Sequence, residues 1–594
     1  MMLKNAFILI VTISFLVSCS SAKVEVDTIL HHATIYSVDS LFTIYESIAI
    51  KDGKIVELNT DKTILQKYGS KNTIDLDGKA VFPGFIDAHC HFYSYGKGLN
   101  ELNLVGTKSF EEVIERTIAF AKERNMFPET NNNKLKKITA EEDWIIGRGW
   151  DQNDWENKQY PDRMKLDSLF PNTPVILQRI DGHAALANAA ALNLAGINSP
   201  EKIKGGTIES MPWPYNETGG DRSMLKEGFV LTGILIDNAV DLVTEKIPKP
   251  SKQQIKKALL IAQENCLAVG LTTVDDAGLE KSIVDAIDEL HKSNELKIRV
   301  YAMLTPNKEN LDHYLKNGIY ITDKLTVRSF KFYGDGALGS RGACLLKDYA
   351  DKKDWKGFLL NDLDYYVKMA DKMDLSGFQM NTHCIGDSAV WSMLAVYGSK
   401  PEMFGDIGGK LFKEICKKRR WRIEHAQVID KKHLEYFKAL SVIPSIQPTH
   451  ATSDMYWAKD RLGEDRVKMA YAYNDLLNAV GVVALGTDFP VEDISPFKTF
   501  FAAVARKDSK GFPEGGFQME NALTREETLK GMTIWAAYSN FEEKQKGSLE
   551  KGKCADLIIL DTDIMKCKIA DVLNTKVLHT YLNGERVYSL NRKK

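Results

Sequence analysis

The stretch Val81-Phe82-Pro83-Gly84-Phe85-Ile86-Asp87-Ala88-His89-Cys90-His91 decides how the rest of this chain is interpreted. Its apolar run is typical of a short buried strand, and two histidines stand at positions i and i+2 at its end. Because side chains alternate between the faces of a strand, His89 and His91 point the same way and Cys90 points the other way. Two imidazoles on one face can hold a divalent metal. The alternative is a pair of solvated or hydrogen-bonded histidines, so further ligands must come from elsewhere in the chain.

The overall composition limits the class of protein. A chain of 594 residues is too long for one simple core, so two or more domains are expected. With 44% hydrophobic and 27% charged residues the chain is globular rather than disordered. The formal net charge of -2 gives no electrostatic argument for a nucleic-acid partner. No nucleic-acid partner is therefore expected, and a homodimer is left open.

The first residues have the order of an export signal. Lys4 precedes the apolar run from Ala6 to Val17, which is too short for an ordinary membrane-spanning helix. Ser18-Cys19 resembles the lipobox of bacterial lipoproteins, in which the signal is cut before the cysteine and the cysteine then carries lipid. We expect residues 1–19 to be such a signal, with acyl chains on Cys19 holding the exported protein to a membrane of the bacterial cell envelope. A plain signal peptide cut near Ser21 or a short anchor is the alternative.

Repeating patterns predict the domains. Residues 20–82 and 546–594 carry short strands and turn pairs such as Asp52-Gly53 and Asn583-Gly584, which suggest one small β-domain built from both ends, although two separate β-subdomains are the alternative. Between them, residues 83–545 alternate strand-like and helix-like segments, which favours a (β/α)8 barrel over a doubly wound sheet. The part from about 100 to 250 is longer than one βα unit needs and is interpreted as an insertion, a lid or specificity segment.

Four more candidate ligands stand at the ends of strand-like segments. Lys331 lies between Phe330 and Phe332, and a lysine inside an apolar strand is costly to bury as a charge. The others are His383, His425 and Asp488. Each alone is more often structural, as a hydrogen-bonded core histidine or a capping aspartate. In a barrel, however, all strands deliver their C-terminal ends to one face, so these residues would converge.

At this point the sequence resembles the metal-dependent amidohydrolase superfamily, and within it the exoenzyme-like branch that includes N-substituted formamide deformylase. The phrases that carry the resemblance are the opening stretch, Gly336-Ala337-Leu338-Gly339-Ser340-Arg341, Ile423-Glu424-His425-Ala426-Gln427 and Gly486-Thr487-Asp488-Phe489-Pro490. The resemblance implies a (β/α)8 TIM barrel joined to a small composite β-sandwich formed by both chain ends. It implies one or two divalent metals, with a carboxylated Lys331 as the bridge between two. His89, His91 and Asp488 would hold the first metal, and His383 and His425 the second. The ligand types suit zinc, and nickel, iron and manganese stay open.

The implied activity is hydrolysis of a non-peptide carbon–nitrogen bond, such as that of an N-acyl or N-formyl amine, through a metal-activated hydroxide. Asp488 would be the catalytic proton shuttle. The alternatives are a deaminase or a lactone or carbamate hydrolase on the same site, or a surface lipoprotein that binds a ligand without turnover. Further phrases of the branch suggest substrate contacts, for each of which a structural role is the alternative: Trp150, Asp151, His183, Asp335, Arg341 and His450.

Overall fold

The computed structural model describes residues 23–99, 101–124, 126, 143–201, 203–212, 228–399 and 410–590. The expected signal segment with Cys19 lies outside the described residues. Within the described ranges, no helix is long and apolar enough to cross a membrane.

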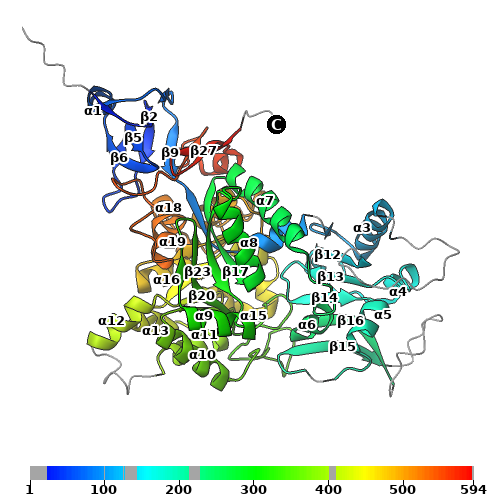
Figure 1. The fold of residues 1–594 in the computed structure, drawn as a ribbon. Helices are drawn as coiled ribbons and strands as arrows, with labels where there is room; N and C mark the ends of the chain where they lie inside the picture. Colours follow the sequence, from blue (N-terminus) through cyan, green and yellow to red (C-terminus); the bar gives the residue numbers. More distant parts are fainter. Residues whose placement is uncertain are drawn as a thin grey trace, which may run out of the picture.

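The centre of the molecule is a parallel β-barrel of eight strands (Figure 1). In order around the barrel the strands are β10 (Phe85–Cys90), β17 (Leu271–Leu279), β18 (Arg299–Leu304), β20 (Leu325–Tyr333), β21 (Gln379–Cys384), β22 (Arg422–His425), β23 (Ile443–Ile446) and β24 (Ala484–Leu485). The ring closes just beyond the last strand, where the N–H of Asp488 donates to the carbonyl of His89 at 2.8 Å and that of His91 donates to Phe489 at 2.8 Å. The barrel predicted from the sequence is therefore confirmed.

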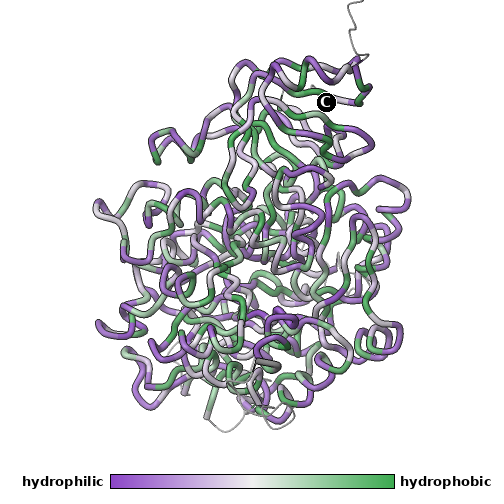
Figure 2. Tube along the Cα trace, turned by 90° about the vertical axis from the view of Figure 1, so that its left-hand side faces the viewer, coloured by the Kyte–Doolittle hydropathy of each residue, from purple (hydrophilic) through white to green (hydrophobic). Residues whose placement is uncertain are grey.

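Helices surround this barrel, because each helix buries its apolar face against the outer side of the strands. The main ones are α7 (Lys252–Ala268), α8 (Lys281–Lys292), α9 (Lys308–Asn317), α10 (Leu363–Ser376), α11 (Asp387–Tyr397), α12 (Lys410–Arg419), α13 (His433–Leu440), α16 (Tyr473–Val480) and α17 (Pro496–Ala505). Helix α7 begins at a capping box made by Ser251 and Gln254, and it buries Leu259, Ala262 and Cys266 at helical spacing. In Figure 2 hydrophobic stretches run through the interior, and hydrophilic ones are concentrated on the outside.

Both ends of the chain build one small β-sandwich. One sheet has the order β6 (Lys54–Asn59), β5 (Ser47–Lys51), β2 (Thr28–His31), β8 (Thr73–Asp75); the other has the order β27 (Glu585–Ser589), β26 (Val577–Leu582), β25 (Leu557–Leu560), β9 (Ala80–Pro83), β3 (Thr34–Tyr36), β4 (Ile44–Tyr45). The N- and C-terminal parts meet where β9 pairs antiparallel with β25, and Val81 and Ile559 share one buried core. The two ends of the chain therefore form one β-domain rather than two separate subdomains, because their strands share a sheet.

The long segment between β10 and β17 forms a third body beside the barrel (Figure 1). Its six strands have the order β11 (Leu102–Asn103), β12 (Ile145–Trp150), β13 (Val175–Arg179), β14 (Ala184–Ala187), β16 (Phe229–Asp237) and β15 (Gly206–Pro212). Helices α3 (Phe110–Glu123), α4 (Met164–Leu169), α5 (Ala189–Ala195) and α6 (Asn238–Thr244) accompany it, and separate hydrophobic clusters lie on the two faces of the sheet. We call this body the inserted sheet.

Candidate metal centre

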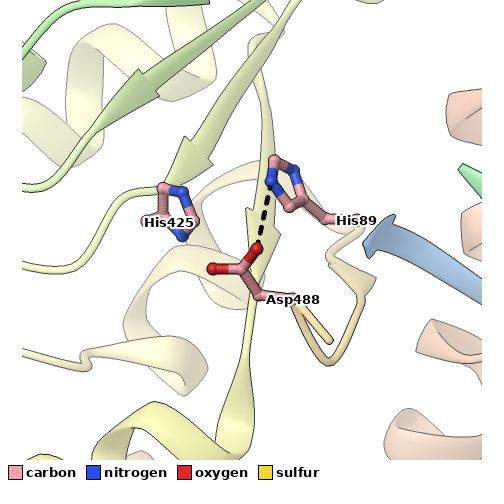
Figure 3. Close-up of side chains that lie close together, drawn as sticks. All are labelled: His89, His425 and Asp488. Carbon is pink, nitrogen blue, oxygen red and sulfur yellow. Dashed lines mark ion pairs between the residues drawn. The ribbon is translucent and has the colours of Figure 1, made fainter. Parts of the chain in front are cut away.

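Three candidate ligands meet at the C-terminal end of the barrel. His89 lies near the end of β10, His425 ends β22, and Asp488 follows β24 by three residues. One ligand atom from each lies within 4.8 Å of the others, and all three side chains are buried (Figure 3). His89 Nε2 stands 3.6 Å from Asp488 Oδ1. Two imidazoles and a carboxylate at such spacing can hold a divalent metal.

Two more residues complete this side of the cluster. His91 Nε2 lies 3.2 Å from Asp488 Oδ1, so both histidines of the opening stretch face the same carboxylate. Lys331 Nζ reaches to 3.1 Å from His89 Nε2, and its side chain is only 1% exposed. Cys90, between the two histidines, instead lies in the barrel core, where its Sγ contacts the carbonyl of Asp275. The strand alternation expected from the sequence accounts for this arrangement.

His383 and His450 stand on the other side of His425. The ring centroids of His383 and His425 are 4.5 Å apart, and those of His425 and His450 are 5.9 Å apart. His450 Nε2 is 3.7 Å from Asp488 Oδ2. The structure thus brings together all six residues that the sequence nominated as ligands, with His450 beside them.

The ligand histidines are held by partners on their far nitrogens. His89 Nδ1 donates to Glu424 Oε2 at 2.6 Å, with both side chains 0% exposed. His425 Nδ1 donates to Gln447 Oε1 at 2.7 Å, and that of His91 donates to the carbonyl of Ala277 at 3.0 Å. Such partners fix the tautomer and leave each Nε2 with its lone pair toward the centre.

Burial and charge set the protonation states that a metal requires. Burial lowers the pKa of His89, and it lowers the pKa values of His383 and His425 far below the ordinary value, so these rings are neutral. Burial opposes the charge of Asp488, yet His91, His89 and His425 together hold its pKa well below the ordinary range. Burial also lowers the pKa of Lys331. Neutral imidazoles with one carboxylate are the ligand forms that bind a metal.

Two ligands sit on strained backbone. His425 has φ +71° and Asp488 has φ +61°, in the left-handed region that non-glycine residues rarely adopt. Such conformations cost on the order of 1–3 kcal/mol each and cluster at functional sites. Here they turn the chain at the end of β22 and beyond β24, where both side chains lie close to His89.

The donor atoms themselves test whether a metal fits. Within the described part of the chain, His383 Nε2 and Asp488 Oδ1 are buried without a hydrogen-bond partner. Buried polar atoms are rarely left unpaired, since each costs about 1–3 kcal/mol. A divalent metal bound by the same atoms would remove this cost, so the residues fit the group.

A cavity of about 1300 Å³ lies between the cluster and the inserted sheet. Asp151, His183 and His450, which the sequence nominated as substrate contacts, line it together with five of the six candidate ligands, all except His89. Asp151 pairs with Arg179, while His183 Nδ1 donates to Asp237 at 2.7 Å.

The other three nominated contacts do not line this cavity. Trp150 is a core residue of the inserted sheet, 1% exposed, and its indole N–H donates to the carbonyl of Leu177. Asp335 is fully buried, with its Oδ1 3.8 Å from Nε2 of His383, and it accepts three backbone N–H groups, while burial raises its pKa to about 7. Arg341 pairs with Asp351 and lines a separate small pocket. For Trp150 and Arg341 the structural alternative fits the observed contacts, whereas Asp335 lies beside the ligand His383.

Comparisons with known proteins agree with this geometry. The model of the family described as "Amidohydrolase family" (Amidohydro_3) matches residues 72–588 of the chain. The chain belongs to the amidohydrolase family. It is 32% identical over 585 residues to "Protein LONG AFTER FAR-RED 3" of Arabidopsis thaliana, covering 96% of this chain and 92% of that protein. It is 23% identical over 586 residues to the N-substituted formamide deformylase of Arthrobacter pascens, covering 94% and 97%. A crystal structure of an uncharacterized metal-dependent hydrolase from Pyrococcus horikoshii matches with TM-score 0.68 and 28% identity, covering 91% of this chain and 99% of that one.

Residues that the sequence did not nominate also shape the site of this amidohydrolase. Glu424 and Gln447 hold ligand histidines, while Arg148 and Arg179 line the cavity from the inserted sheet. Glu424 carried the same signal that drew attention to Lys331, a charge inside a buried strand. The arginines gave no comparable signal, because their positions depend on how the inserted sheet packs.

Proposed function

We propose that this amidohydrolase cleaves a carbon–nitrogen bond outside peptides, in an N-acyl or N-formyl amine, with zinc as its metal. The observation that carries the proposal is the cluster of neutral histidines and anionic Asp488 at the floor of a large cavity. The deformylase relative, by its name, acts on substituted formamides, which supports this choice among amidohydrolase reactions.

We propose further that two metals would share the ligand set. His89, His91 and Asp488 would hold the first ion, and His383 and His425 the second. Lys331 would join them as a carbamate: its amine nitrogen forms a bond to the carbon of CO₂ and releases a proton, which leaves an anionic carboxylate. Within the described residues Lys331 has no ion-pair partner within 4.0 Å and is almost fully buried, an unfavourable state for a cation. A metal, when bound, supplies a lower pKa for water and positive charge for the developing oxyanion.

The remaining chemistry belongs to side chains of the chain. Asp488 accepts the proton of the attacking water and delivers it to the leaving amine. Its two oxygens face different neighbours, Oδ1 toward His91 and Oδ2 toward His450. Glu424 keeps His89 oriented, and the walls of the cavity hold the substrate over the ligands.

A substrate panel with a chelator control tests the proposal. Wild-type protein should release amine from N-formyl and N-acetyl amines, lose activity with chelator, and regain it with zinc. Asp488→Asn should lower turnover by about 10²–10⁴-fold, the usual worth of a general base. Asp508→Asn, which removes an exposed carboxylate paired with Tyr456, is the matched control and should behave as wild type. Hydrolysis of amidines, lactones or carbamates instead, or Asp488→Asn turnover within tenfold of wild type, would contradict it.

We also propose that the protein is exported and anchored by lipid on Cys19, where it acts on small molecules. The order of Lys4, the apolar run and Ser18-Cys19 supports this proposal.

A further inference from the structure

Arg148 is a cation on the cavity wall with no acidic partner among the residues that the structure describes. It comes from β12 of the inserted sheet and lines the same cavity as the ligands. Its guanidinium donates to the carbonyl of Ile180 at 3.2 Å, and its Nε is buried without a partner among the described residues. Within the described chain, no carboxylate lies within 4.0 Å of it. A guanidinium has five donors, and here most of them are free for a ligand.

The other cations of the described cavity wall are already engaged. Arg179 pairs with both Asp151 and Asp181, Lys498 pairs with Asp493, and Lys331 contacts His89. Carboxylates outnumber cations on this wall, but most of them have a partner: Asp237 has His183, Glu101 has Lys97, and Glu492 has Ser453. Among the described residues of the cavity wall, Arg148 is therefore the cation that can bind an anionic group of a ligand.

Local backbone geometry aims Arg148 at the cavity. The pairing of β12 with β13 shifts between Arg148 and Trp150, as in a β-bulge. Gly149 inside this bulge has φ +114°, and a Cβ there would lie 2.5 Å from Val105 Cγ2, so only glycine fits. Bulges next to active sites re-aim side chains. Trp150 consequently enters the core while Arg148 faces the cavity.

Neighbouring strands place polar groups in line with it. Asn103 of β11 and Gln178 of β13 are the register partners of Arg148, and both line the cavity. A guanidinium flanked by amides matches the planar geometry of a carboxylate, which arginine binds with two parallel hydrogen bonds.

We infer that Arg148 binds a carboxylate of the substrate, so that the hydrolysed amide belongs to an N-acylated or N-formylated amino acid. This inference rests on the proposed function for the identity of the scissile bond, and it adds the anionic end of the substrate. Burial lowers the pKa of Arg148 while Asp488, Glu101 and Asp181 oppose this, as expected for a guanidinium short of a close counter-charge.

The test offers each substrate in two forms. N-formyl and N-acetyl derivatives of glycine, leucine and phenylalanine are compared as free acids and as carboxamides, and the ratio of the two kcat/KM values is measured. Wild type should favour the acids. Arg148→Met should reduce that ratio by about 10- to 100-fold, the effect of one lost charge-assisted hydrogen-bond pair. Arg148→Lys, which keeps the charge and loses the fork, should fall between them. Arg586→Met on the exposed strand β27 of the β-sandwich is the control and should match wild type. A wild-type ratio near one, or an unchanged ratio in Arg148→Met, would overturn the inference.

A binding arm separates this inference from the proposed function. Calorimetry with N-acetylglycine and N-acetylglycinamide on the zinc-loaded protein needs no turnover. If wild type hydrolyses nothing in the panel but prefers the acid as a ligand, and Arg148→Met loses that preference, the anion site stands while the proposed reaction fails. Equal binding of acid and amide by wild type rejects the anion site. Arg148→Lys serves if Arg148→Met does not fold.

Discussion

Removing the charge of Glu424 should loosen metal binding without unfolding the protein. Glu424 Oε2 accepts from His89 Nδ1 at 2.6 Å, and both side chains are 0% exposed. Burial opposes the charge of Glu424, yet His89, Arg422 and Lys331 hold its pKa below the ordinary value, so it is a carboxylate. An anion on the far nitrogen makes the imidazole a stronger ligand.

The size of the effect follows from what each substitution leaves behind. Glu424→Gln keeps an oxygen for the Nδ1–H of His89 and removes only the charge, so we expect metal affinity to fall by about 10- to 100-fold. That is about 1.4–2.7 kcal/mol of binding free energy. Glu424→Ala also leaves the buried Nδ1–H of His89 without an acceptor. We expect this to weaken metal binding by a further amount of about 1–3 kcal/mol. The predicted order of metal affinity is therefore wild type, Glu424→Gln, Glu424→Ala.

Competition with a graded series of chelators, read by metal content after dialysis, measures this order. Thermal unfolding of each metal-free protein reports separately on folding. Glu543→Gln is the matched control, because Glu543 pairs with Arg420 on a partly exposed side of the chain and should not affect the metal. If both Glu424 variants bind metal as tightly as wild type, the orienting role of this carboxylate is wrong.

Three further outcomes follow. Lys331→Ala should bind fewer metal ions than wild type, because the proposed carbamate bridge between the two ions would be lost. Intact wild-type protein should show the added mass of one CO₂ by native mass spectrometry, whereas an unmodified wild-type mass would refute the carbamate. Burial opposes the charge of Asp556, but Arg299 at 2.6 Å holds its pKa below the ordinary value. The pair therefore contributes stability that is present above the unfolded pKa of about 4 and is lost as pH falls through the lower folded pKa. Asp556→Ala should cost about 3–5 kcal/mol near neutral pH and flatten the acid side of the stability profile, measured by denaturant unfolding. Cys19→Ser should move the expressed protein from the membrane to the soluble fraction of a bacterial host, and retention in the membrane would refute the lipid anchor.

Much of the metal site could be predicted because its geometry is a property of strands. His89 and His91 share a face through the two-residue period, and parallel strands deliver His383, His425 and Asp488 to one end. The lone charge in an apolar strand marked Lys331. These signals need no knowledge of distant contacts.

What could not be predicted depends on contacts between distant segments. Glu424 reaches His89 across 335 positions of sequence, between strands that are not neighbours in the barrel. In the inserted sheet, the bulge at Gly149 decides that Trp150 is buried and Arg148 faces the cavity. A Gly-Trp pair in a sequence does not show which side of a sheet will meet the barrel.

The seam that closes the barrel also builds half of the metal centre. Buried Asp87 accepts from the hydroxyl of Thr487 at 2.7 Å and from the backbone N–H groups of Thr487 and His89 at 3.0 and 3.2 Å. The N–H of Asp488 then donates to the carbonyl of His89, so the loops that carry His89, His91 and Asp488 are bonded to one another by the chain itself. None of these hydrogen bonds uses the side chain of His89, His91 or Asp488, because the donors and acceptors are backbone groups and the side chains of Asp87 and Thr487. The contacts that close the barrel therefore fix the spacing of three ligands and leave their side chains available to a metal.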